Sequence, residues 1–318
     1  MQTDFTPDQL ALPQIAAADS ILRKCVHCGF CTATCPTFVL LGDELDSPRG
    51  RIYLIKDMLE TGKPPTAKVV KHIDRCLSCL ACVTTCPASV DYQHLVDRGR
   101  ARIEETFTRP LPERIVRSLL AFVLPRPALF RLALVGAWVA KPLKGLLPAR
   151  LGAMFGLAPA TIPGPSPVDR PQVFPAEGKR RKRIALMTGC AQQVLRPEIN
   201  EATVRLLVRH GCEVVVAAGA GCCGALVHHM GRETEALDQA RANVEAWERA
   251  AAADGGLDAI VINASGCGTQ VKDYGWMLGH DPDWAERGAK IAALARDVSE
   301  VMLELGFSAP PRPRPARW

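Results

Sequence analysis

Two short segments of the chain each carry four cysteines at the same spacing. The first, CVHCGFCTATCP, begins at Cys25, and the second, CLSCLACVTTCP, begins at Cys76. Both follow the pattern C-x2-C-x2-C-x3-C-P, in which three closely spaced thiolates bind one iron–sulfur cluster and the fourth, beside the proline, binds a neighbouring cluster. A zinc site needs four ligands in all and usually takes them as two CxxC pairs, so zinc is the less favoured alternative.

The tandem pattern therefore predicts two [4Fe–4S] clusters that exchange their fourth ligands. The expected ligands are Cys25, Cys28, Cys31 and Cys86 for the first cluster, and Cys76, Cys79, Cys82 and Cys35 for the second. Gly29 and Ala81 are small enough for a close backbone approach to the sulfur atoms. His27, between two ligands, is expected to tune its cluster and is not needed to bind iron.

A third group of cysteines lies in the C-terminal half, in the segments TGCAQ, AGCCGA and ASGCG. Each segment follows a predicted strand, so the cysteines are expected to meet at the carboxyl edge of a parallel sheet. The group consists of Cys190, Cys222, Cys223 and Cys267. We expect a third iron–sulfur cluster here, with a dithiol or a zinc site as the alternative. Cys212 starts a strand and is expected to be a buried apolar residue.

Other sequence patterns near these cysteines do not indicate a further binding or catalytic site. GAGCCG at 219–224 matches a dinucleotide fingerprint, but the next strand ends at Asn263 without an acidic residue for a ribose, so nucleotide binding is rejected. His228 and His229 could relay protons or bind metal, although a structural role is favoured. The sequence shows no Ser/His/Asp set and no paired carboxylates, so no catalytic residue is assigned.

Hydrophobic periodicity divides the chain into two kinds of structure. Helical spacing and start signals predict helices at 8–24, 47–63, 65–76, 92–107, 111–124 and 127–143. Farther along, short apolar runs predict strands at 183–189, 212–218 and 259–265, separated by helices at 197–211 and 233–255. An alternation of strand and helix is typical of a parallel α/β sheet.

The expected fold class is α + α/β. The predicted parts are a helical ferredoxin domain with two clusters at 1–108, a basic helical connector with a Pro-rich linker at 109–182, an α/β cysteine-rich CCG domain with a parallel sheet at 183–307, and a Pro/Arg tail at 308–318. KRRKR, just before the first strand, is expected to be a solvated edge.

Charge and composition narrow the class of partner. The net charge is +6, and the segment from Arg109 to Arg183 carries fourteen Lys and Arg against three acids. This segment fits an anionic partner or a membrane surface, or else a solvated connector. The helix at 127–143 is too short to span a bilayer and suits an in-plane or subunit contact, with core packing as the alternative. Aromatic residues make up only 5%, which disfavours nucleic-acid binding.

The start of the chain does not resemble a secretory signal, so we expect a cytoplasmic protein whose thirteen cysteines stay reduced. In such a compartment the cysteines are better interpreted as metal ligands than as disulfides.

The tandem cysteine segments, GDELDSPRGRIYLIK between them, RPLPERI after them and the GC…GCCGA…ASGCG series occur in one order over roughly residues 19–305. In this combination the chain resembles the iron–sulfur subunit of bacterial glycolate oxidase, a family that joins a tandem 4Fe-4S ferredoxin to CCG domains. The family usually has two CCG repeats and this chain has one.

The resemblance implies an electron-transfer subunit that works with two flavoprotein-type subunits. Those partners would oxidise glycolate to glyoxylate, and this chain would pass the electrons towards a quinone-type acceptor at the cytoplasmic face of the inner membrane. The alternatives are a related complex that oxidises glycerol 3-phosphate or lactate or reduces a heterodisulfide, and a zinc-stabilised scaffold.

Overall fold

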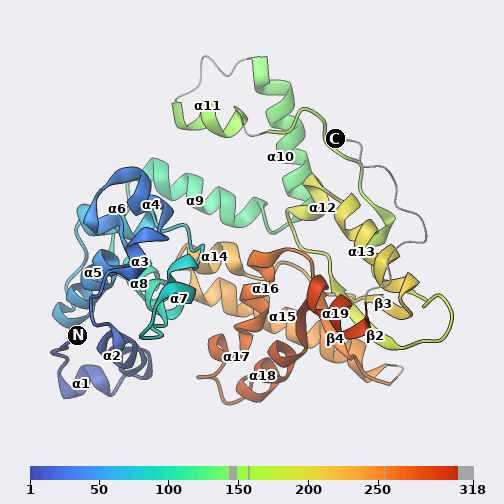
Figure 1. Ribbon diagram of the computed structural model, residues 1–318. Helices are drawn as coiled ribbons and strands as arrows, with labels where there is room; N and C mark the ends of the chain where they lie inside the picture. Colours follow the sequence, from blue (N-terminus) through green and yellow to red (C-terminus); the bar gives the residue numbers. More distant parts are fainter. Residues whose placement is uncertain (143–148, 157, 254, 307–318) are drawn as a thin grey trace. The chain divides into compact units, whose positions relative to one another are not determined.

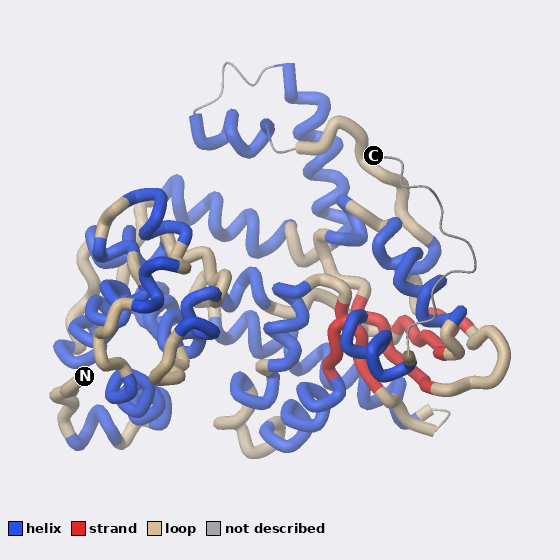
Figure 2. The backbone as a smooth tube through the Cα atoms, viewed as in Figure 1, coloured by secondary structure: helices blue, strands red, loops and turns tan. Residues whose placement is uncertain are grey.

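The structure is a computed structural model that describes residues 1–142, 149–156, 158–253 and 255–306. It divides into two compact units. The N-terminal unit comprises Met1–Ser118 with Leu226–Ala236, and the C-terminal unit comprises Leu119–Ala225 with Leu237–Trp318. The predicted tail at 308–318 lies outside the described residues. The predicted fold class, a helical ferredoxin part and an α/β part, is confirmed (Figures 1 and 2).

The N-terminal unit is built from helices joined by loops, and its described residues contain no strand. Its main helices are α1 (Pro7–Leu10), α2 (Pro13–Lys24), α3 (Phe30–Ala33), α4 (Pro36–Leu41), α5 (Pro48–Thr61), α6 (Ala67–Asp74), α7 (Ala81–Thr85) and α8 (Tyr92–Thr106), with a 3-10 turn η1 (Glu44–Asp46). The single helix predicted at 8–24 is wrong, because Pro13 begins a second helix at its first position, where a missing N–H costs nothing.

The core of this unit forms between α2, α5 and α8. Leu22, Ile55 and Leu95 are fully buried there. The approach of α8 to α5 depends on Gly99, because a Cβ at that position would lie 2.9 Å from Cγ1 of Ile55. The core thus fixes the helices whose ends carry the cysteine loops.

The C-terminal unit contains a sheet of five strands among the described residues, in the order β1-β3-β2-β4-β5. The strands, red in Figure 2, are β1 (Gln172–Phe174), β2 (Lys182–Met187), β3 (Cys212–Val216), β4 (Ala259–Ile262) and β5 (Ala295–Asp297). β1 is antiparallel to β3, and the other pairs are parallel. β1 lies inside the segment that was predicted to be a linker, and it nevertheless pairs with the sheet.

Helices cover both faces of this sheet. The described helices that follow α8 are α9 (Leu111–Val123), α10 (Pro127–Ala140), α11 (Ala149–Gly156), α12 (Gln192–Leu195), α13 (Glu198–Arg209), α14 (Ala225–His229), α15 (Glu233–Ala252), α16 (Ser265–Lys272), α17 (Tyr274–Met277), α18 (Ala285–Leu294) and α19 (Val298–Leu305), with a 3-10 turn η3 (Pro167–Asp169). Successive residues of β2 alternate between the two cores: Met187 packs with Trp247, while Leu186 packs with Leu207. Such burial on both sides explains why the strands are continuous apolar runs.

The basic segment before β2 is only partly the solvated edge that the sequence predicts. The side chain of Arg183 is buried, and it donates hydrogen bonds to Glu213 and to the carbonyl oxygens of Ala250 and Gly256. Arg180 remains about half exposed. Arg183 therefore helps to hold α15 against the sheet.

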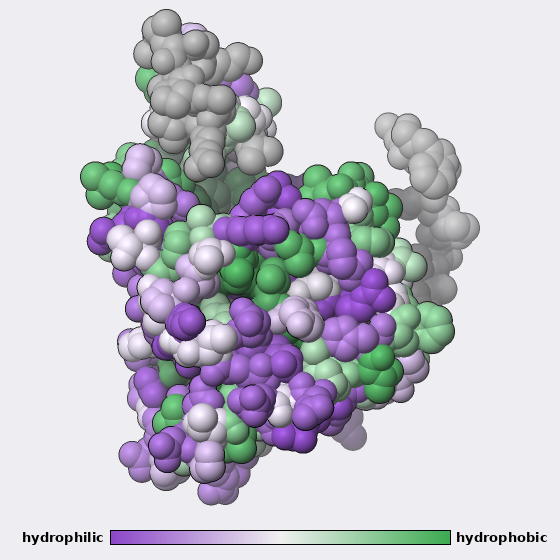
Figure 3. Space-filling model, turned by 90° about the vertical axis from the view of Figure 1, so that its left-hand side faces the viewer, coloured by the Kyte–Doolittle hydropathy of each residue, from purple (hydrophilic) through white to green (hydrophobic). Residues whose placement is uncertain are grey.

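The connector helices α9 and α10 leave many apolar side chains exposed, including Phe122, Leu132 and Trp138. Core packing was one of the alternatives for the helix predicted at 127–143. In α10 such packing is seen at Leu134, on the inner face of the helix. No helix in the described ranges has the length and apolar character needed to cross a membrane. One face of the molecule shows hydrophobic residues in small groups among hydrophilic ones (Figure 3).

Candidate metal centres

The two cysteine loops of the N-terminal unit repeat the same backbone course. Each leaves a helix at its first cysteine, Cys25 after α2 and Cys76 shortly after α6. The second residue after that cysteine is left-handed in both loops, His27 with φ 56° and Ser78 with φ 50°. The fourth is left-handed as well, at Gly29 (φ 84°) and Leu80 (φ 57°). Left-handed residues curl a short loop around a centre, although they cost free energy where a side chain is present.

The structure gathers these cysteines into two adjoining cavities. The first cavity, of about 450 Å³ including its open part, is lined by Cys25, Cys28, Cys31, Cys82 and Cys86. The second, of about 300 Å³, is lined by Cys35, Cys76, Cys79 and Cys82. Each cavity thus takes three cysteines from one loop and receives the last cysteine of the other loop, while Cys82 borders both.

The chemistry of this donor set fits iron–sulfur clusters. Soft thiolates select iron–sulfur clusters, zinc or copper(I), and four of them around each of two adjoining cavities match the needs of a pair of cubanes. Burial, followed by the nearby charge of Cys76, raises the pKa of Cys82 to about 12. Burial likewise raises the pKa of Cys31. The packed thiolates are therefore stable together only when positive charge lies among them.

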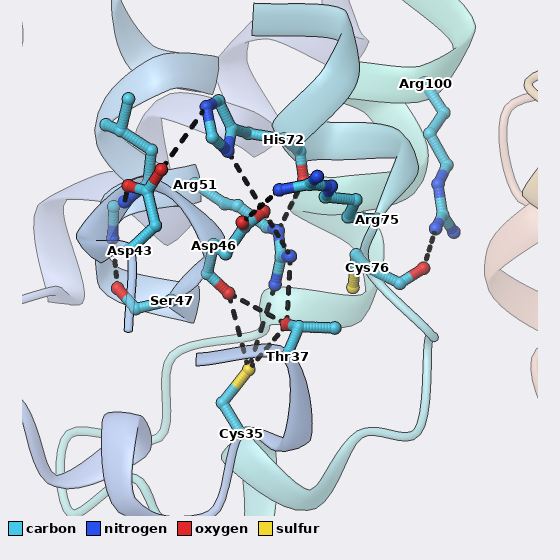
Figure 4. A network of polar contacts seen from close by, with 12 residues as sticks. Cys35, Thr37, Asp43, Asp46, Ser47, Arg51, His72, Arg75, Cys76 and Arg100 are labelled. Atoms are coloured by element: carbon cyan, nitrogen blue, oxygen red, sulfur yellow. Dashed lines mark hydrogen bonds and ion pairs between the residues drawn. The ribbon is translucent and has the colours of Figure 1, made fainter. Parts of the chain in front are cut away.

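Cys35 has a different environment, because polar side chains surround it (Figure 4). Its Sγ lies 3.2 Å from the Thr37 hydroxyl and 3.8 Å from Nη1 of Arg51. Burial raises the pKa of the Cys35 thiol, but the Thr37 hydroxyl, the backbone N–H groups of Phe38 and Thr37, and the Arg51 charge together outweigh it, so the pKa is lowered. The groups around this sulfur therefore stabilise its anionic form.

A close contact between η1 and α5 positions these polar groups. Ser47 caps α5 by accepting a hydrogen bond from the Gly50 N–H. A Cβ on Gly50 would lie 2.0 Å from the Glu44 carbonyl oxygen, so only glycine allows η1 to pack there. Asp46 in η1 then reaches Arg51, one turn farther along α5.

In the C-terminal unit, the third cysteine group comes together as the sequence predicts. Cys190 follows β2, the adjacent pair Cys222 and Cys223 follows β3, and Cys267 lies in the first turn of α16 after β4. Cys190 shares a side-chain hydrogen bond with Cys222, Cys222 with Cys223, and Cys223 with Cys267. Hydrogen bonds from Cys190 and Cys223 lower the pKa of Cys222, whereas Cys222 and Cys267 raise that of Cys223.

Two buried polar residues hold the loop that carries this cysteine pair. Asn243 on α15 accepts a hydrogen bond from the Gly221 N–H and donates one to the Cys222 carbonyl oxygen. The Tyr274 hydroxyl accepts a bond from Asn243 and donates one to the Cys223 carbonyl oxygen. Sequence reasoning missed both residues. The one available signal was the placement of Asn243 on the otherwise apolar inner stripe of its helix.

The structure also shows the surroundings of Cys212 and of the histidines that the sequence analysis named. Cys212 is fully buried in the core between sheet and helices, as expected. His27 lines the first cysteine cavity, and burial together with the N-terminal charge lowers its pKa. His229 pairs with the buried carboxylate of Asp97 on α8 at 3.4 Å, and His228 approaches the same carboxylate. Both histidines therefore support α8 from the segment 226–236.

Arg51, Asp46 and Thr37 were also missed by sequence reasoning. The sequence of this segment indicates only a helix start and a family resemblance. Nothing in the sequence pattern distinguishes Arg51, whose side chain is 1% exposed, from Arg49, whose side chain is 33% exposed. The contacts of Arg51 with Cys35 and His72 arise only when three separate helices meet.

Two family models match the chain. The model described as "4Fe-4S dicluster domain" matches residues 21–90, and the one described as "Cysteine-rich domain" matches residues 184–272. These matches cover the two cysteine loops and most of the sheet with its cysteine group. The chain thus has an iron–sulfur domain and a cysteine-rich domain.

Curated relatives cover nearly the whole chain. The glycolate oxidase iron-sulfur subunit of Escherichia coli (strain K12) is 46% identical over 96% of this chain and 71% of its own length. The probable glycolate oxidase iron-sulfur subunit of Bacillus subtilis (strain 168) is 33% identical over 90% of this chain and 66% of its own length. The lactate utilization protein A of Halalkalibacterium halodurans is 26% identical over 39% of this chain and 48% of its own length.

This chain therefore spans about 66% to 71% of the length of the two glycolate oxidase relatives. No solved structure matches it. The extent and level of identity to the Escherichia coli protein, together with the cysteine geometry, show that the chain belongs to the family of glycolate oxidase iron-sulfur subunits.

Proposed function

We propose that this chain is the electron-transfer subunit of a complex that oxidises glycolate to glyoxylate. Two flavoprotein-type subunits would carry out the oxidation and hand their electrons to this chain, which would pass them to a quinone-type acceptor at a membrane surface. The names of the two glycolate oxidase relatives support the substrate, and the paired cysteine cavities support the electron-transfer role. No residue of this chain is assigned to catalysis.

The proposed ligands follow the two cavities. We assign one [4Fe–4S] cluster to Cys25, Cys28, Cys31 and Cys86, and a second to Cys35, Cys76, Cys79 and Cys82. Bound there, the clusters would supply one-electron carriers. The crossed arrangement of the cavities is the observation that carries the proposal, because a zinc scaffold has no need of two adjoining four-cysteine sites.

In each set of proposed ligands one cysteine is exposed, which suits electron transfer to or from a partner protein. Cys28 and Cys79 are exposed, whereas Cys25, Cys35 and Cys82 are buried. Exposed apolar side chains lie next to them in sequence: Val26 and Phe30 around Cys28, and Leu77 before Cys79. Apolar residues around an exposed site are typical of a docking surface. Electrons would enter and leave through these two edges.

For the third group, Cys190, Cys222, Cys223 and Cys267, we propose a further iron–sulfur cluster. The mutual hydrogen bonds of the four thiols support this assignment, because they bring four sulfur donors within reach of one another. We also propose that the connector at 109–182 provides the contact with the membrane surface or acceptor, since it is basic and exposes apolar side chains.

Metal analysis of the anaerobically purified chain tests the proposal. Two cubanes require about eight irons per chain, and a third cluster raises this to about twelve. A colourless protein with stoichiometric zinc would contradict the electron-transfer function and would indicate a zinc-stabilised scaffold instead. Co-purification with flavoprotein subunits, followed by a comparison of glycolate, lactate and glycerol 3-phosphate as electron donors, tests the substrate.

A further inference from the structure

The two cysteine cavities differ in the groups that face their sulfur atoms. At the first cavity the donors are backbone N–H groups: that of Val90 lies 3.5 Å from Sγ of Cys86, and that of Arg49 reaches Cys31. At the second cavity side chains act in addition to the backbone N–H groups of Thr37 and Phe38 at Cys35. The Tyr92 hydroxyl lies 3.5 Å from Sγ of Cys76, in addition to Thr37 and Arg51 at Cys35 (Figure 4).

Contacts on every side fix the guanidinium of Arg51. Its Nε donates to the His72 carbonyl oxygen at 2.7 Å, and its Nη2 donates to the Thr37 hydroxyl at 3.0 Å and to Asp46 Oδ1 at 3.4 Å. Nη1 is thereby directed towards Sγ of Cys35 at 3.8 Å. A planar guanidinium that is held by its other donors has little freedom to move away from this sulfur.

The carboxylate nearest to Arg51 does not belong to Arg51 alone. Asp46 is fully buried, but its carboxylate also accepts a hydrogen bond from Arg75 at 2.7 Å and lies 3.0 Å from Nδ1 of His72. One carboxylate is thus shared among several partners, two of which are arginines. Asp43, the other acid of the network, lies 3.9 Å from Nε2 of His72, and its side chain is 46% exposed. The guanidinium of Arg51 is therefore the charged group in contact with Cys35.

Arg49 provides an internal comparison on the same helix. It lies two residues before Arg51 and near the first cavity, where its Nη1 is 3.4 Å from the His27 carbonyl oxygen. Its Nε pairs with Glu44 at 2.7 Å, and a third of its side chain is exposed. Water and the paired carboxylate screen this charge, whereas Arg51 acts in a buried medium where charges interact more strongly.

Reduction adds one negative charge to a cluster and its thiolates, and hydrogen bonds and local charge set how favourable that is. We propose that Arg51 is a positioning residue that raises the potential of the cluster held by Cys35, Cys76, Cys79 and Cys82 above that of the other cluster, so that an electron shared between them resides mainly on the Cys35 side. This inference rests on the proposed function, because it assumes the two crossed clusters.

The test uses the full chain purified anaerobically, with its iron content measured and both clusters titrated against potential by electron paramagnetic resonance. Cys79→Ser identifies the signal of the second cluster, because it alters one ligand of that cluster and none of the first. Arg51→Gln should lower the midpoint of this signal by about 59 mV or more, a tenfold change in the one-electron reduction equilibrium. Arg49→Gln, the matched control, should shift neither midpoint by as much as half of that.

If Arg51→Gln does not retain its iron, Thr37→Val provides the same test. It removes the hydroxyl that contacts Cys35 and that accepts a hydrogen bond from Arg51. The midpoint of the second cluster should again fall, by less than in Arg51→Gln. Wild-type iron with unchanged potentials in these variants overturns the inference and leaves the proposed function standing. A first cluster that shifts as much as the second also overturns it. Four or fewer irons in the wild type overturn both.

Discussion

Asn243 and Tyr274 allow a quantitative test of how the sheet edge holds its cysteine pair. Replacing Asn243 by leucine removes its bonds to the Gly221 N–H and the Cys222 carbonyl oxygen while filling a similar volume. A lost hydrogen bond costs about 1 kcal/mol net, and more when a buried backbone group is left unpaired, so the loop should open more easily by about 2 kcal/mol. Tyr274→Phe removes one bond to the loop, the one to the Cys223 carbonyl oxygen, together with the bond that the hydroxyl accepts from Asn243. Asn243 keeps both of its own bonds to the loop, so the expected cost to the loop is about 1 kcal/mol.

Hydrogen exchange measures this local opening directly. Because 1.4 kcal/mol corresponds to a tenfold change in an equilibrium constant, the amides of 221–224 should exchange about 30-fold faster in Asn243→Leu and about fivefold faster in Tyr274→Phe. Asp238→Asn, on an exposed part of the same helix, should leave these amides unchanged. Equal protection of the loop in wild type and Asn243→Leu would show that these bonds do not hold the cysteine pair in place.

Two further predictions concern folding. Gly50→Ala should destabilise the N-terminal unit by about 1–3 kcal/mol, because its Cβ would meet the Glu44 backbone. Calorimetry should show this as a lower melting temperature. Gly136→Ala is the control and should cause no such fall, because its Cβ would lie in open space. Arg183→Ala should cost the C-terminal unit about 1.5–3 kcal/mol, because it removes the hydrogen bonds to Glu213 and to the buried carbonyl oxygens of Ala250 and Gly256. Arg180→Ala, at a more exposed arginine, should cost less than about 1 kcal/mol. Equal losses for the two arginines would contradict the buried role of Arg183.

The grouping of the cysteines could be predicted from the sequence because the relevant information is local, whereas their role as metal ligands stays a prediction. The spacing within each segment dictates which sulfurs can share a centre, and the proline after the fourth cysteine begins a helix in the first segment, at Pro36. The apolar runs of β2, β3 and β4 also carried enough signal for the parallel sheet. In each case the deciding residues lie within one element.

The features that could not be predicted depend on residues far apart in the chain. In the sequence Arg51 resembles any other helix arginine, because its contacts with Cys35 and His72 form only when the start of α4 and α6 pack against α5. Asn243 meets the Gly221 N–H from 22 residues away. β1 was missed because proline-rich sequence indicates a linker, while its pairing depends on the exposed edge of β3.

Single alanine variants at three ligands test whether the two cysteine loops exchange their fourth ligands. Cys35→Ala, Cys79→Ala and Cys28→Ala are each purified anaerobically, and the remaining cluster is identified by its paramagnetic resonance spectrum. With crossed ligands, Cys35→Ala should retain the same signal as Cys79→Ala, although Cys35 is closer in sequence to Cys28. If Cys35→Ala instead retains the signal that survives in Cys28→Ala, each loop binds its own cluster and the crossed arrangement is wrong.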